Sequence, residues 1–124
     1  MRLILDTHAF LWWRDDDSRL KPAVRDQIAR SELVVFSAVS AWEIAIKAGI
    51  GKLRLSTTLE RVFDPPGFSK LALSASHALA LSDLPPHHRD PFDRMLIAQA
   101  VAEGLTVVTH DRRFESYAVS VLWT

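Results

Sequence analysis

Short apolar runs that stop at a polar residue, with a helical stretch after each, most strongly limit how this chain can fold. Three of these runs are LIL at residues 3–5, LVVF at 33–36 and LTVVT at 105–109. Runs of this length, bounded by cap or turn residues, favour buried strands over helices. Their alternation with helices predicts an α/β fold with helices on both faces of a mainly parallel sheet.

The remaining elements follow from periodicity and from proline and glycine positions. Pro22 and Pro91 suit the first turn of a helix, and Gly104 suits a helix end. No internal repeat, low-complexity tract or linker interrupts the pattern, so we expect residues 1–124 to form a single domain. Strands are predicted at 3–5, 33–36, 71–73, 105–109 and 119–123, and helices at 8–14, 22–30, 38–48, 57–62, 76–81, 91–103 and 111–117.

Two aspartates follow predicted strands, where sheets of this kind form their sites. Asp6 comes directly after the first strand, and Asp111 follows the strand that ends at Thr109. The carboxyl ends of parallel strands lie at one edge of the sheet, so both should share that edge. Each aspartate could equally be the N-cap of the next helix.

Asp93 lies in the helical register of an inward-facing stripe. Leu96, Ile97 and Ala100 follow it at helical spacings of three, four and seven residues. A carboxylate in this register faces the core instead of water. The alternative is a capping box, with Asp90 as N-cap and Asp93 at the third helical position. Asp90 alone would satisfy the helix end, so we interpret Asp90 as the cap.

Glu43 has two local interpretations as well. It stands at capping-box spacing from Ser40, and it could pair with Lys47 one helical turn later. It could also point toward the edge of the sheet, and spacing alone does not decide between these positions.

Several carboxylates that meet at one edge would repel one another unless a cation neutralises them. Oxygen ligands favour a hard ion, Mg²⁺ or Mn²⁺, and such a cluster suits hydrolysis of a phosphodiester. The chain has no cysteine, which excludes disulfides, thiolate zinc sites and cysteine nucleophiles. With 15 Lys and Arg against 15 Asp and Glu, bulk charge does not attract a polyanion, so a local basic patch or bound metal must do so.

Four ordered segments resemble the PIN-domain toxins of the VapC type, the ribonucleases of toxin–antitoxin pairs. They are LILDTHAFLWW (3–13), SAVSAWEIAIKAGIGKLRL (37–55), LPPHHRDPFDRMLIAQA (84–100) and LTVVTHDRRFESYAVSVLW (105–123). The resemblance implies a three-layer α/β/α sandwich and hydrolysis of RNA with Mg²⁺ or Mn²⁺. It also implies a homodimer held inactive by a small antitoxin, with no direct DNA binding by this chain.

The resemblance assigns roles to particular residues. It implies that Asp6, Glu43, Asp93 and Asp111 are the catalytic acids and the metal ligands. Thr109 is implied as a supporting hydroxyl that orients a ligand or a water molecule.

Other residues near these acids have less definite roles. His87 and His88 lie in a proline-rich loop and are expected to be solvated. The cationic residues near the acids are expected either to bind phosphates or to remain solvated: Lys47, Arg94, Arg112 and Arg113. The roles of His8, His110, Trp12 and Trp13 stay open, although one of the two tryptophans should be left for a partner surface.

Two other functions remain as alternatives. In an aspartyl-phosphate enzyme Asp6 would be a nucleophile, but the second acid that such enzymes place nearby is replaced by Thr7 or His8. In a binding module without catalysis, the acids would serve only as helix caps. No apolar stretch approaches the ~18 residues of a membrane span, and the start of the chain does not look like a signal peptide, so we expect a cytoplasmic protein.

Overall fold

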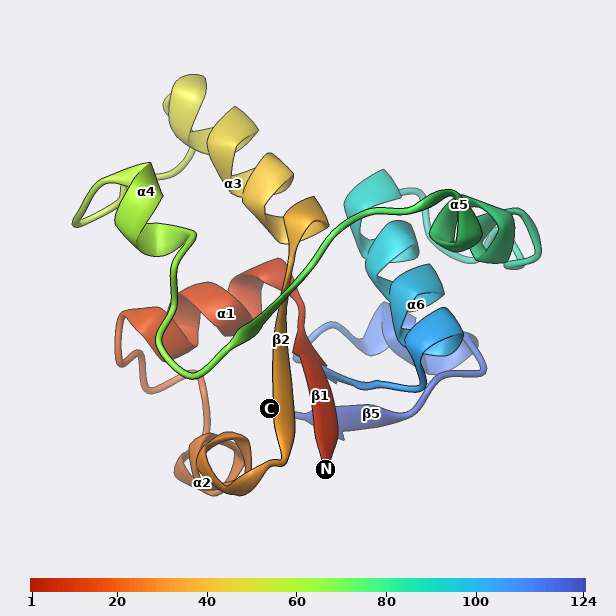
Figure 1. Ribbon diagram of the computed structural model, residues 1–124, viewed down its shortest axis with the longest axis horizontal. Coiled ribbons are helices and arrows are strands. Elements are labelled where there is room, and N and C mark those ends of the chain that lie inside the picture. The colour runs from red at the N-terminus through yellow and green to blue at the C-terminus, as the bar shows by residue number, and fades with distance from the viewer.

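A parallel five-stranded sheet in the order β3-β2-β1-β4-β5 forms the centre of the computed structural model, which describes residues 1–124 (Figure 1). The strands are β1 (Arg2–Leu5), β2 (Leu33–Ser37), β3 (Ser69–Leu71), β4 (Thr106–Thr109) and β5 (Val121–Trp123). Every neighbouring pair is parallel, and Ile4 of β1 pairs with Val35 on one side and Val107 on the other. The mainly parallel sheet predicted from the sequence is therefore confirmed.

Six α-helices and one 3₁₀ helix surround this sheet. They are α1 (Thr7–Arg14), α2 (Pro22–Arg30), α3 (Ala38–Gly49), α4 (Leu59–Val62), α5 (Ala75–Ser82), α6 (Pro91–Glu103) and the 3₁₀ helix η1 (Arg112–Ser116). The bounds of α2 and α6 agree with the sequence prediction. Pro22 and Pro91 open these helices, and Gly104, with φ 67°, ends α6 in a conformation that favours glycine.

Alternation along the strands divides the core into two apolar clusters. Leu3 and Leu5 face one cluster with residues of α1, α2 and α4, whereas Ile4 faces the other with residues of α6 and η1. Successive strand residues point to opposite faces, so the central strand is covered on both sides. Helix α5 packs on α6, and α3 contacts both α1 and α6. The result is the three-layer α/β/α arrangement.

Short elements at the edges depart most from prediction. β3 is Ser69–Leu71 instead of 71–73, and β5 begins at Val121 instead of 119. Leu71 pairs with Ser37, the last residue of β2, so the ladder has no partner for the residues beyond it. Val119 donates its backbone N–H to the Tyr117 carbonyl in a turn, which delays β5.

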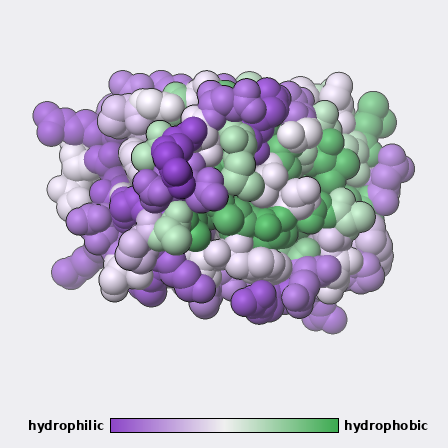
Figure 2. All heavy atoms as spheres, turned by 90° about the horizontal axis from the view of Figure 1, so that it is seen from below, coloured by the Kyte–Doolittle hydropathy of each residue, from purple (hydrophilic) through white to green (hydrophobic).

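The surface at the lower edge of Figure 1 is mixed in polarity. Seen from below, this face carries the amino end of β1 and shows a band of apolar side chains among polar ones (Figure 2). The strands run away from it, so the residues that follow them lie at the opposite edge. No helix is both long and apolar enough to cross a membrane.

Candidate active site

Asp6 and Asp111 lie at the carboxyl ends of β1 and β4, and both are helix N-caps. Asp6 accepts the backbone N–H of Ala9 at 2.8 Å and so caps α1, while its other oxygen accepts the Thr109 hydroxyl at 2.5 Å. Asp111 caps η1 by accepting the backbone N–H of Arg113 at 3.0 Å. The capping alternative and the shared edge are thus compatible, because one carboxylate does both.

Asp93 has no such capping task. Asp90 caps α6, accepting the backbone N–H groups of Phe92 at 2.8 Å and of Asp93 at 3.1 Å. The Asp93 side chain is only 16% exposed, and its Oδ2 lies 3.0 Å from His88 Nε2. The prediction of Asp90 as the cap is confirmed, and Asp93 occupies an inward position that helix capping does not explain.

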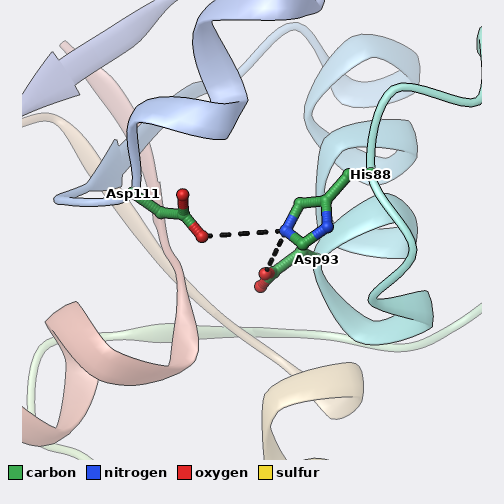
Figure 3. A group of neighbouring side chains, drawn as sticks. All are labelled: His88, Asp93 and Asp111. Carbon is green, nitrogen blue, oxygen red and sulfur yellow. Dashed lines mark hydrogen bonds and ion pairs between the residues drawn. The ribbon is translucent and has the colours of Figure 1, made fainter.

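His88 is the main correction to the sequence analysis, which expected a solvated pair of histidines. Its side chain is 2% exposed, and Nε2 lies 3.0 Å from Asp93 and 3.7 Å from Asp111 (Figure 3). The loop before α6 turns His88 inward, while His87 remains exposed beside Tyr117. Periodicity carries no information in an irregular loop, so no sequence signal separated the two histidines.

The tautomer of His88 follows from its other nitrogen. Nδ1 accepts the backbone N–H of Asp90 at 3.2 Å, so in the neutral ring Nε2 carries the proton. Nε2 therefore donates to Asp93 and is not free to bind a metal ion. His88, Asp93 and Asp111 bring potential ligand atoms within 4.8 Å of one another, but the two carboxylates are the donors that fit a hard cation.

Glu43 is buried and has both oxygens in use. Thr7 donates its hydroxyl to one oxygen at 2.6 Å, and Lys47 binds the other at 2.5 Å, which confirms the predicted pairing with Lys47. Ser37, not Ser40, caps α3, so the capping box of Ser40 and Glu43 does not form. Ser40 Oγ instead lies at hydrogen-bond distance, 3.1 Å, from the Thr7 hydroxyl oxygen.

Burial and neighbouring charges shift the pKa values of the acids at this edge of the sheet. The pKa of Asp93 is raised to about 8, mainly by burial and further by the negative charges of its neighbours, which are Asp90, Asp6, Glu43 and Asp111. Burial also raises the pKa of Asp6 despite its bond from Thr109. Arg113 lowers the pKa of Asp111 through hydrogen bonds to its carboxylate. We call Asp6, Glu43, His88, Asp93 and Asp111 the acidic cluster.

The residues present fit a bound divalent cation. The cluster supplies carboxylate oxygens from four segments, without cysteine and without a free histidine nitrogen, a donor set typical of Mg²⁺ or Mn²⁺ sites. Lys47 and Arg113 are the cations bonded to its acids, one to Glu43 and one to Asp111. Asp6 and Asp93 have no cationic side chain of Lys or Arg within salt-bridge distance, so the cluster lacks positive charge where these two acids lie.

An open cavity of about 440 Å³ adjoins the acidic cluster at Asp6 and Asp111. Its other lining residues are His8, Trp12, Arg19, His110 and Arg112. A substrate phosphate could reach the acids from this side. Arg19 and His110 come from segments far apart in the chain, and no local sequence pattern connects them.

Comparison with known proteins defines the class. A family model for the PIN domain matches residues 3–120. The chain therefore belongs to the PIN-domain family.

One relative indicates the type of PIN domain. The chain is 29% identical over 120 residues to "Ribonuclease VapC22" of Mycobacterium tuberculosis (strain ATCC 25618 / H37Rv), covering 93% of this chain and 91% of that protein. The resemblance to VapC-type PIN domains is thereby confirmed.

Solved structures share the fold at low sequence identity. VapBC2 from Rickettsia felis, solved with a DNA fragment from its promoter, matches with TM-score 0.74 and 14% identity, over 98% of both chains. DNA-bound VapBC from Salmonella typhimurium matches with TM-score 0.68 and 17% identity, over 98% of this chain and 97% of that chain. FitAcB from Neisseria gonorrhoeae matches with TM-score 0.63 and 19% identity, over 97% of this chain and 96% of that chain.

Proposed function

We propose that this chain is a metal-dependent endoribonuclease and the toxin of a toxin–antitoxin pair. The observation that carries the proposal is that Asp93 and Asp111 bring ligand atoms within 4.8 Å of each other in a PIN-domain fold. Asp6 and Glu43 lie close enough for their charges to raise the pKa of Asp93. The similarity to a protein named as a VapC ribonuclease supports the same activity.

Asp6, Asp93 and Asp111 are the residues that would hold the cation, Mg²⁺ or Mn²⁺. Glu43, the fourth ligand expected from the sequence, already binds Thr7 and Lys47 through its two oxygens. A cation bound there would lower the pKa of a water molecule and withdraw charge from the phosphoryl oxygens. We retain Glu43 as a catalytic acid of the proposal, although Thr7 and Lys47 occupy its oxygens.

The neighbouring residues orient these acids. Thr109 donates to Asp6 and accepts the backbone N–H of Asp111 at 3.0 Å, so one hydroxyl connects the ends of two strands. His88 donates to Asp93, and Lys47 neutralises Glu43. Such bonds fix the direction of ligand oxygens before a cation or substrate arrives.

The expected partners follow from the relatives. We propose a small antitoxin protein as the partner that restrains activity, because the structural neighbours include VapBC assemblies. RNA is the proposed substrate. A homodimer, a single domain over residues 1–124 and a cytoplasmic location complete the proposal.

The acidic cluster disfavours both alternative functions. An aspartyl-phosphate enzyme needs an accessible nucleophilic oxygen, yet Asp6 is 4% exposed and both its oxygens accept hydrogen bonds. A module whose acids serve only as caps leaves Asp93 unexplained, because Asp90 already caps α6.

The test is RNA cleavage by the purified full chain, with and without EDTA. We expect cleavage with Mg²⁺ or Mn²⁺, none with EDTA, and a loss of about 10³-fold for Asp6→Asn and Asp93→Asn, the scale seen when one group that stabilises transition-state charge is removed. Asp26→Asn on α2 is the matched control, because Asp26 is exposed and pairs only with Arg30. Unchanged cleavage by Asp93→Asn in a nuclease-free preparation would refute the proposed site.

A further inference from the structure

A groove leads away from the acidic cluster along α1 toward the loop before α2. The cavity beside Asp6 and Asp111 and a second cavity of about 490 Å³ share the lining residues Trp12, Arg19 and His110. Ser18, Lys21 and Thr124 complete the lining of the second cavity. The two cavities therefore adjoin each other at these residues, and each is large enough for a small-molecule-sized group. We call them together the Trp12 groove.

The Trp12 groove has acidic side chains only in its first cavity, whereas cationic side chains line both. Asp6 and Asp111 line the first cavity together with Arg112. Arg19 lines both cavities, and Lys21 lines only the second. Arg19 is bound by Asp17 through Nε and Nη2, which leaves Nη1 unbonded. Lys21 and Arg112 are exposed and make no salt bridge. In a chain with net charge zero, Lys21 and Arg112 thus place two positive charges without a salt-bridge partner in this groove.

Aromatic side chains lie among these cations. Trp12 stacks on His8 with ring centroids 6.3 Å apart, meets His110 edge-on at 5.8 Å, and has the Arg19 guanidinium 5.0 Å from its ring centre. His110 donates from Nδ1 to the Thr124 carbonyl at 2.7 Å, so its Nε2 is the acceptor of the neutral ring. Aromatic side chains interleaved with cations are typical of surfaces that bind single-stranded nucleic acid.

We propose that the Trp12 groove binds the nucleotides of a single-stranded RNA that adjoin the cleaved phosphate, with a base against Trp12 and backbone phosphates at Lys21, Arg19 and Arg112. The inference rests on the proposed function, because it places the cleaved bond at the acidic cluster. A polyanion fits better than a protein segment here, since the groove offers two cations without a salt bridge, Lys21 and Arg112, together with aromatic rings and few aliphatic lining residues. The groove would then hold the strand while the acids act on one phosphate.

The test measures binding separately from cleavage. A fluorescein-labelled single-stranded RNA octamer is titrated with the full-length chain in EDTA, where no cutting is expected, and fluorescence anisotropy reports the Kd. We expect Trp12→Leu to weaken binding about tenfold through loss of base stacking. Lys21→Gln and Arg112→Gln should each weaken binding about fivefold and reduce the salt dependence by roughly 0.7 in log–log slope, the value for one phosphate contact on a single strand.

Matched controls separate this role from folding. Arg61→Gln removes an exposed cation from α4, outside the groove, and should leave the Kd within twofold. Trp12→Phe retains a stacking ring and should keep most of the affinity even if Trp12→Leu is poorly folded. Lys21 and Arg112 are exposed, so their variants test the groove without disturbing the core.

The outcomes distinguish this inference from the proposed function. Unchanged RNA affinity in Lys21→Gln, Arg112→Gln and Trp12→Leu would overturn the groove even if the protein cleaves RNA. Weakened binding in a protein that never cuts would support the groove and reject the nuclease. If these substitutions weaken binding of the antitoxin protein but not of the RNA octamer, the groove is a protein-docking surface and the inference is wrong.

Discussion

Helix α6 contributes to two buried polar groups that differ in how their charges are balanced. Near its start, Asp93 belongs to the acidic cluster, where like charges face one another. Farther along, Gln99 joins Ser37 and His77 in what we call the amide network. Gln99 accepts the Ser37 hydroxyl at 2.5 Å and donates to the Ala72 carbonyl at 3.5 Å and to His77 Nδ1 at 3.3 Å.

The amide network is satisfied by the protein alone. His77 Nδ1 also accepts the backbone N–H of Ser74, and its Nε2 meets the half-exposed Glu103 at 3.2 Å. Buried groups with complete hydrogen bonding stabilise and specify a fold, whereas buried like charges without a counter-ion destabilise it. Helix α6 thus contributes to the amide network, which stabilises the fold, and to the acidic cluster, whose negative charges need a cation from outside the chain.

The strongest test of this contrast is removal of the amide. Gln99→Ala should lower the free energy of unfolding by about 3 kcal/mol, because it opens a cavity and leaves the Ser37 hydroxyl without an acceptor. Urea denaturation measures the loss. Gln27→Ala on α2, which removes a side chain that makes no hydrogen bond within the protein, should change the free energy of unfolding by less than about 0.5 kcal/mol. A Gln99→Ala protein as stable as the wild type would contradict the structural role.

The second test adds the missing charge. At roughly 100 times its Kd, Mg²⁺ or Mn²⁺ should stabilise the wild-type protein by about 2.7 kcal/mol through mass action. Differential scanning fluorimetry against a NaCl control of equal ionic strength measures the shift, and Asp93→Asn should lose most of it. Equal shifts in both proteins would place the cation elsewhere.

The third test removes the repulsion between carboxylates instead of adding a cation. The pKa of Asp93 is about 8 in the folded protein against an ordinary 3.8, so the folded state binds the extra proton between these values. Stability of the metal-free protein should therefore fall as pH rises from about 4 to about 8.

Asp93→Asn should remove most of this slope and stabilise the EDTA-treated protein by about 2 kcal/mol near neutral pH. Part of the slope should remain, because burial also raises the pKa of Asp6. Urea denaturation at several pH values measures both effects, and destabilisation by Asp93→Asn would show that its charge is already neutralised within the protein.

The smallest effect is expected at the solvent-facing end of the amide network. Glu103 is 42% exposed, and an amide in its place still accepts the His77 proton. Glu103→Gln should therefore change the free energy of unfolding by less than about 0.5 kcal/mol and leave RNA cleavage unchanged. A large loss by urea denaturation would mean that the network depends on this charge.

The sequence predicted the fold because long elements carry their own signals. Helix α6 has a proline start, an inward stripe and a glycine end, and both of its bounds agree with the structure. The three-residue strands β3 and β5 have no such periodicity, and their positions depend on pairing with distant residues.

The residues of the candidate site likewise fall into those that a local sequence pattern indicates and those that depend on tertiary contacts. Asp6 and Asp111 follow strands and Asp93 lies in a helical register, so local pattern indicated them. His88 is turned inward by an irregular loop, and the amide network joins Ser37, His77 and Gln99 across segments that no local pattern connects. The Trp12 groove likewise depends on tertiary contacts between α1 and the loops after β4 and before α2.

Asp6 and Asp111 are both helix caps and members of the acidic cluster, and this double role has a genetic consequence. Each of these acids begins a helix as well as facing the cluster, so most substitutions there impair folding together with cleavage. Asp93 begins no helix, since Asp90 does that for α6. Under the proposed function, cells that escape the toxin through an intact, abundant but inert protein should carry their mutations chiefly at Asp93, and escape mutations at Asp6 should be accompanied by low protein levels.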